Sequence, residues 1–84
     1  MTEMIVAILF YLNLLVPNQD YNYQEVNSIY QTNMEAVSTI YYNEVTSQQA
    51  MVEFQSSSNY NHAIGLIGEW EDELPIPTLP PPSM

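Results

Sequence analysis

The stretch that decides the fold is MIVAILFYLNLLV, residues 4–16, in which Asn13 alone interrupts a run of apolar side chains. Thr2 is the predicted N-cap and Pro17 the predicted stop, so we expect a short helix within residues 1–17. A helix that is apolar on all sides is buried in protein or lies in contact with membrane. The run is shorter than the about 20 residues that span a bilayer. We therefore expect a helix buried at a subunit or domain interface.

The charge of the chain excludes whole classes of function. Its 84 residues include ten Asp and Glu and no Lys or Arg, which gives a net charge of −10. Binding to nucleic acid depends on basic side chains that neutralise phosphates, so direct binding to DNA or RNA is excluded. The absence of Cys removes disulfides and thiolate chemistry. Charge steering instead favours protein partners with basic surfaces.

The length of the chain supports one small domain of marginal stability. Small scaffolds without disulfides or metals often gain stability by oligomerising or by docking onto a partner. This favours a subunit of a multi-copy or hetero-oligomeric assembly over a free-standing enzyme. The first residues show neither a positive n-region nor a small-residue cleavage site, so no classical secretory signal peptide is expected.

Residues 18–58 are rich in Asn, Gln, Ser, Thr and Tyr, and their apolar positions recur with a helical spacing that predicts one long amphipathic helix. The alternation in residues 50–55 and the β-branched and aromatic content of residues 37–45 leave strand open as an alternative. Two helices in place of one are also open. Few Gly or Pro punctuate the region, which favours helix. The apolar positions are Val26, Ile29, Tyr30, Met34, Val37, Ile40, Tyr41, Val45, Met51 and Val52.

Three polar residues, Asn33, Glu44 and Gln48, fall inside this apolar stripe. Asn33 is either a buried polar residue that sets register or a solvated residue at the edge of the stripe. Burying Glu44 without a cation is costly, and the chain supplies no basic side chain. Glu44 is therefore solvated, protonated or paired with a cation of another molecule, which makes it a candidate partner-binding residue.

Residues 59–74 contain a short apolar element followed by an acidic cluster around Trp70. An aromatic anchor rimmed by charge is typical of a peptide that docks into a basic groove. The cluster lacks the spaced oxygen ligands and the turn glycine of a calcium-binding loop, so no metal site is expected there. The candidate partner-binding residues of this region are Glu69, Trp70, Glu71, Asp72, Glu73 and Leu74.

Residues 75–84 hold five of the six prolines of the chain. Such a run favours the extended polyproline II conformation. The segment from Pro77 to Pro80 matches P-x-x-P, although the chain has none of the basic residues that usually accompany ligands of this kind. We expect an extended arm that lies along another subunit, with Pro77 and Pro80 as candidate contacts.

His62 is the single histidine of the chain. A Ser-His-Asp set with the serines at 56–58 can be imagined, but no nucleophile-elbow pattern supports it, so a surface or capping role is favoured. A histidine without companions is also too little for a zinc site. The sequence predicts no catalytic residue, no metal and no cofactor.

Taken together, these patterns predict a mainly α fold with a short apolar N-terminal helix, a long amphipathic middle helix and an extended acidic, proline-rich C-terminal arm. The leading functional prediction is a non-catalytic structural or assembly subunit of a virion or other large assembly. One alternative is an acidic mimic of nucleic acid that inhibits a DNA- or RNA-binding enzyme, although its carboxylates are sparse along the chain. Another is a small membrane-associated subunit that uses residues 4–16.

Overall fold

The computed structural model describes residues 2–80, and over this range it contains helices and no strand. The prediction of a mainly helical fold is confirmed. The strand alternative for the middle region is wrong, because that region is helical apart from short joints. The helices are α1 (Thr2–Tyr11), α2 (Tyr23–Thr32), α3 (Met34–Tyr41), α4 (Glu44–Ser56) and α5 (Tyr60–Gly68).

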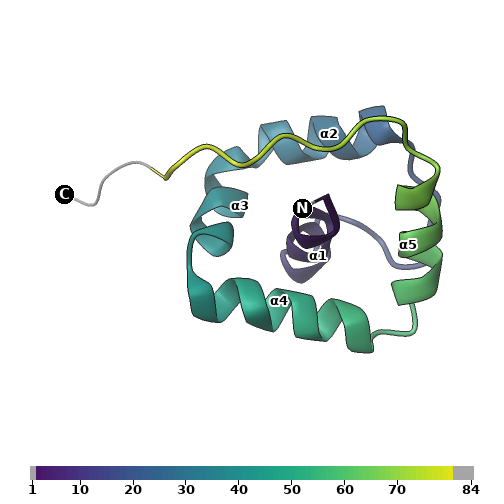
Figure 1. Ribbon diagram of the computed structural model, residues 1–84, viewed down its shortest axis with the longest axis horizontal. Coiled ribbons are helices and arrows are strands. Elements are labelled where there is room, and N and C mark those ends of the chain that lie inside the picture. Colours follow the sequence, from purple (N-terminus) through teal and green to yellow (C-terminus); the bar gives the residue numbers. More distant parts are fainter. Residues whose placement is uncertain (1, 81–84) are drawn as a thin grey trace.

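Helix α1 lies at the centre of the molecule, and α2, α3, α4 and α5 form a four-sided frame around it (Figure 1). Its residues from Ile5 to Leu9 are at most 2% exposed, so the helix is covered on every side by the chain itself. Each large aliphatic side chain that leaves water in this way contributes about 1.5–3 kcal/mol to folding. The apolar run at 4–16 thus supplies much of the core.

Helix α1 ends at Tyr11, six residues before the predicted stop at Pro17. Asn13 adopts a left-handed backbone conformation with φ of 60°. The Leu14 N–H donates to the Leu9 carbonyl and the Asn13 N–H to the Phe10 carbonyl, both at 2.9 Å, which is the bonding pattern of a Schellman motif. Asn13 therefore terminates the helix, because Asn tolerates the left-handed conformation that the motif requires.

Thr2 belongs to α1 and has a different role from the predicted N-cap. Its side-chain oxygen accepts a hydrogen bond from the backbone N–H of Leu74 at 3.1 Å. Both residues are buried. Thr2 therefore joins the start of the described chain to a segment near its end.

The predicted long middle helix is wrong: two asparagines divide it into α2, α3 and α4. At the first break, the Ile29 carbonyl accepts both the Asn33 backbone N–H at 3.1 Å and the Asn33 side-chain amide at 2.8 Å, so a local side-chain bond is added where α2 ends. At the second, the Asn43 side chain accepts hydrogen bonds from the N–H groups of Val45 (3.0 Å) and Thr46 (3.1 Å), which makes Asn43 the N-cap of α4. Local hydrogen bonding by Asn thus competes with helix continuation.

The break at Asn43 also changes which face of the following helix is buried. Val45 and Val52, which were expected on the apolar stripe, are 73% and 61% exposed. The buried face of α4 instead consists of Ser47, Ala50 and Phe54. The periodic stripe fails in α4 because a new helix starts with a new direction.

Replacing Asn13 tests the motif that ends α1. Asn13→Val should destabilise the protein by about 1–2 kcal/mol, because a β-branched side chain is strained at positive φ, and this corresponds to a fall in Tm of at least about 4 °C in a chain of this size. Thermal unfolding followed by circular dichroism measures the effect. Asn13→Gly is the matched control and should leave Tm within a few degrees, since Gly adopts this conformation freely. Equal Tm values for the two variants would contradict the assignment.

Candidate protein-interaction site

The chain returns across the frame after α5 in two short segments. Residues 69–73, here called the acidic linker, carry four carboxylates, and residues 74–80, here called the arm, lie in an extended conformation. The arm runs along α2 and then past α3 (Figure 1). The arm and α2, which are far apart in the sequence, therefore form one surface.

Tyrosine hydroxyls from α2 and from the end of α3 hold this extended stretch by its backbone. Each hydroxyl donates a hydrogen bond to a main-chain carbonyl, and each bond contributes about 0.5–1.5 kcal/mol net. Two of the three acceptors are proline carbonyls, which suits residues that lack an N–H to donate. The pairs are Tyr23 with Glu73 (3.2 Å), Tyr30 with Pro75 (2.7 Å) and Tyr42 with Pro77 (2.7 Å).

The burial of the arm repeats every three residues. Leu74 and Pro77 are buried and Pro80 is half-buried, while Ile76 and Leu79 are 61% and 77% exposed. Three residues per turn is the repeat of polyproline II. The arm therefore has one face against the body of the protein and one apolar face towards solvent.

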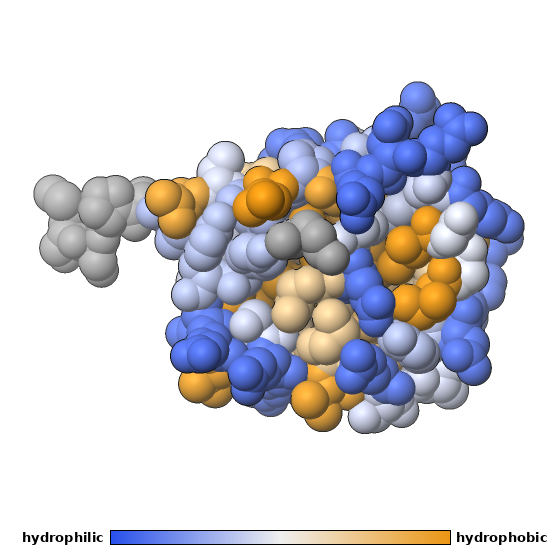
Figure 2. All heavy atoms as spheres, viewed as in Figure 1, coloured by the Kyte–Doolittle hydropathy of each residue, from blue (hydrophilic) through white to orange (hydrophobic). Residues whose placement is uncertain are grey.

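Figure 2 shows these features on the molecular surface. Hydrophilic atoms gather where the acidic linker turns back towards α2, and apolar atoms lie along the path of the arm up to its far end. Acidic and apolar groups are thus neighbours on one face.

The structure divides the predicted partner-binding residues into two sets. The carboxylates of the acidic linker are exposed. Leu74 and Pro77 are buried in the chain's own body instead of being displayed to a partner. Trp70 is half-buried, with its ring edge-on to Tyr23 at a centroid distance of 5.9 Å. Pro80 is half-buried at the end of the arm.

Glu44 lies apart from the arm. It is the first residue of α4 and is exposed, so the expected conflict of a buried carboxylate does not arise. Its charge there is favourable because the N-terminus of a helix carries partial positive charge. Glu44 and the acidic linker are not brought together by any hydrogen bond among the described residues.

Ile76 and Leu79 are the two surface residues that sequence reasoning missed. A repeat of three applied to the proline-rich stretch would have placed both on one face, opposite Leu74 and Pro77. That repeat was available in the sequence. Using it to place these residues would have required assuming that the arm packs on the chain's own body.

Burial changes the ionisation of Tyr30, the central tyrosine of this site. Its side chain is fully buried, and burial raises its pKa from 10.0 to about 12, with smaller contributions from Tyr42 and Tyr41. A neutral hydroxyl is thereby retained as the donor to Pro75. Elsewhere in the molecule, a hydrogen bond to Glu3 raises the pKa of Tyr60.

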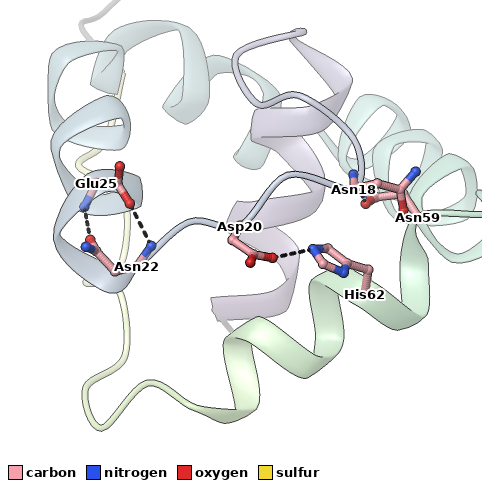
Figure 3. Close-up of polar contacts among 6 residues, drawn as sticks. All are labelled: Asn18, Asp20, Asn22, Glu25, Asn59 and His62. Carbon is pink, nitrogen blue, oxygen red and sulfur yellow. Dashed lines mark hydrogen bonds and ion pairs between the residues drawn. The ribbon is translucent and has the colours of Figure 1, made fainter.

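His62 links α5 to the loop that follows α1. Its Nε2 lies 3.0 Å from Oδ1 of Asp20, and nearby the Asn59 side chain accepts the N–H of Asn18 at 2.7 Å (Figure 3). Asn22 and Glu25 form a capping box at the start of α2 in the same view. No hydrogen bond joins His62 to a serine within the described residues 2–80.

The part of the chain that the structure describes contains no group of three or more His, Asp or Glu residues placed to hold a metal ion. A hollow of about 260 Å³ opens between α1, α4 and the residues before α5, and Phe10 and Phe54 line it. Glu53 is the one charged residue of its lining.

The fold and the site together define an acidic helical module with a docked extended arm. Comparison of the chain with protein-family models, with curated proteins and with solved structures finds no match.

The pKa of Tyr30 predicts a loss of stability at alkaline pH. The Tyr30 hydroxyl ionises near pH 10 in the unfolded chain and near pH 12 in the folded protein. The stability that its neutral form contributes is therefore complete below pH 10. It is lost between pH 10 and 12, by up to about 2–3 kcal/mol.

Urea unfolding of the wild type and Tyr30→Phe at pH 9 and pH 11 measures this effect. At pH 9 the variant should be less stable by about 1 kcal/mol, because the Pro75 carbonyl loses its donor. At pH 11 the difference should shrink or reverse, since the variant has no hydroxyl to ionise. A constant difference between the two proteins would contradict a buried, hydrogen-bonded hydroxyl.

Proposed function

We propose that the chain is a non-catalytic assembly subunit that binds a basic surface of a partner protein through the acidic linker and the outward face of the arm. The observation that carries this proposal is the placement of exposed carboxylates at one end of an extended arm whose Ile76 and Leu79 side chains are exposed. The acidic groups attract and orient a basic partner, and the apolar groups supply area to bury. Electrostatic complementarity and an apolar centre are the usual components of a protein interface.

The distribution of charge supports a basic partner. Nine of the ten acidic residues are exposed, and Glu3 is half-buried. The chain has no Lys or Arg with which to neutralise them. The resulting negative field favours encounter with a positively charged surface.

The arm supports binding because it is already ordered. An extended segment held by hydrogen bonds loses little conformational freedom on binding, and preorganisation of this kind raises affinity. Proline restricts the backbone further. Ile76 and Leu79 are thus displayed in a fixed relation to the acidic linker.

A viral particle is the setting that we propose, by analogy with small subunits that reach neighbours through extended arms. A second candidate is an acidic mimic of nucleic acid, which the exposure of nine carboxylates favours. Mutation separates the two: Ile76→Ser/Leu79→Ser should weaken an assembly contact and leave unchanged a mimic that acts through its carboxylates.

The membrane alternative depends on the apolar run at 4–16. In the described residues, no helix combines the length and the apolar character needed to cross a bilayer. The residues from Ile5 to Leu9 are buried by the chain's own helices. A membrane-associated subunit therefore remains the least supported of the three proposals.

Binding of a fluorescent peptide of alternating Lys and Leu residues tests the interaction site. Its affinity for the full chain should fall as NaCl rises from 50 to 500 mM, because exposed charges are screened. The double variant Glu71→Gln/Asp72→Asn should weaken binding about fivefold, which is about 1 kcal/mol.

The matched control is Glu35→Gln/Glu53→Gln, which removes the same charge from α3 and α4. It should weaken binding less than twofold, since these residues lie outside the acidic linker. Ile76→Ser/Leu79→Ser should also weaken binding at high salt, where the apolar contribution remains. Equal losses from the two charge variants would show that the attraction is spread over the molecule, and the proposed site would be wrong.

A further inference from the structure

The surface beneath the arm has the chemistry of a peptide-recognition site. The hydroxyls of Tyr30 and Tyr42 donate to carbonyls of the arm, and Thr2 accepts the N–H of Leu74. Each of these bonds is made to the backbone of the arm. Specificity comes from the side chains of Leu74 and Pro77, which are buried against the body of the protein.

These contacts select an extended backbone and a short sequence pattern. An extended segment in which a leucine is followed by prolines one and three residues later satisfies all of these contacts. Aromatic surfaces that receive proline-rich segments by this kind of contact are a general mode of peptide recognition. We call this surface the arm seat: Thr2, Tyr30 and Tyr42, together with the residues that bury the side chains of Leu74 and Pro77.

The present occupant of the arm seat is poorly matched in charge. Four carboxylates precede Leu74 within five residues, and Tyr23 holds the carbonyl of the last of them. The chain contains no Lys or Arg to compensate for this density of negative charge. The other six acidic residues of the chain lie in residues 2–68, which carry the seat, so the occupant and its support are both negative and repel one another.

A segment with the same apolar pattern and basic residues before the leucine would keep every contact and reverse this repulsion. We propose that the arm seat recognises extended Leu-Pro-x-Pro segments with basic flanks on a partner protein, and that the chain's own arm occupies the seat as an autoinhibitory stand-in. This inference rests on the proposed function for its basic partner alone and adds a different contact. The partner's segment displaces the arm and binds beneath it, whereas the outward face with Ile76 and Leu79 meets the partner only while the arm stays docked.

Tethering sets the competition between the two occupants. The arm is linked to the body through five residues, so its effective concentration at the seat is on the order of millimolar. A free segment with the same affinity at micromolar concentration therefore cannot displace it. The additional attraction between basic flanks and the acidic surface is what allows a partner to compete.

Two peptides that differ only in charge test this inference on the full chain. The first is residues 69–80, EWEDELPIPTLP. The second carries Glu69→Lys, Glu71→Lys, Asp72→Lys and Glu73→Lys within the same sequence. Fluorescence anisotropy at 50 mM NaCl should give an affinity for the second peptide at least about tenfold higher than for the first, with a strong dependence on salt.

A third peptide separates the arm seat from general attraction of charge. It has the four lysines and also Leu74→Asp, so it keeps most of the basic charge and loses the side chain that fills the core. It should bind at least about tenfold more weakly than the lysine peptide. Equal binding of these two peptides would overturn the arm seat and leave the proposed function intact.

Variants of the protein test the same surface from the other side. Leu74→Asp in the full chain should release the arm and tighten binding of the lysine peptide about tenfold, because the tethered competitor is lost. Tyr30→Phe added to Leu74→Asp should reduce this affinity about fivefold, since one donor to the bound carbonyl is removed. Unchanged affinity in both variants would overturn the inference.

The wild-type chain decides the question if Leu74→Asp does not fold. Binding of the lysine peptide should shift the amide resonance of Leu74 in a nitrogen–proton spectrum, because its hydrogen bond to Thr2 is broken on displacement. Binding without a change at Leu74 would place the peptide outside the arm seat. Absence of binding by this peptide, with binding of the Lys–Leu peptide retained, would overturn this inference alone.

Discussion

The structure depends on covering one helix that is apolar on every side. A helix with a single apolar stripe needs one neighbouring layer, but α1 needs partners around its whole circumference. The frame of α2, α3, α4 and α5 supplies most of that cover (Figure 1), and Leu74 with its bond to Thr2 contributes at the N-terminal end of α1. The arm is therefore part of the core as well as part of the surface.

Neutral hydrogen bonds take the place that ion pairs hold in most small proteins. Asparagines form the joints: Asn13 ends α1, Asn33 divides α2 from α3, and Asn43 caps α4. Tyrosine hydroxyls donate to main-chain carbonyls of the arm and of Glu73, the last residue of the acidic linker. Within residues 2–80, the contact of His62 with Asp20 is the one that has the geometry of an ion pair. A chain without Lys or Arg can therefore fold and still leave most of its carboxylates in water.

The helical class could be predicted from the sequence, because it follows from composition and from the spacing of the apolar residues. The arm was expected along another subunit, and residues 74–80 lie instead on the chain's own helices. The division of the middle region could not be predicted, since the same Asn residue is compatible with a helix interior, a cap or a break until its side-chain partner is known. Val45 and Val52 were expected on the apolar stripe and are exposed for the same reason, because a new helix begins after Asn43. Likewise, Leu74 is an apolar residue beside charges, and nothing local shows whether it faces its own core or another molecule. Long-range packing decided that question.

The contact between Thr2 and Leu74 joins residues that are 72 positions apart. At a synthesis rate of about 5–20 residues per second, roughly 4–14 s pass on the ribosome between the first of these residues and the second. Helix α1 is thus synthesised several seconds before the segment that completes its cover. Contacts of such long range also slow folding. The nascent chain consequently exposes part of α1 until this segment follows, and the negative charge of the chain opposes self-association during that interval.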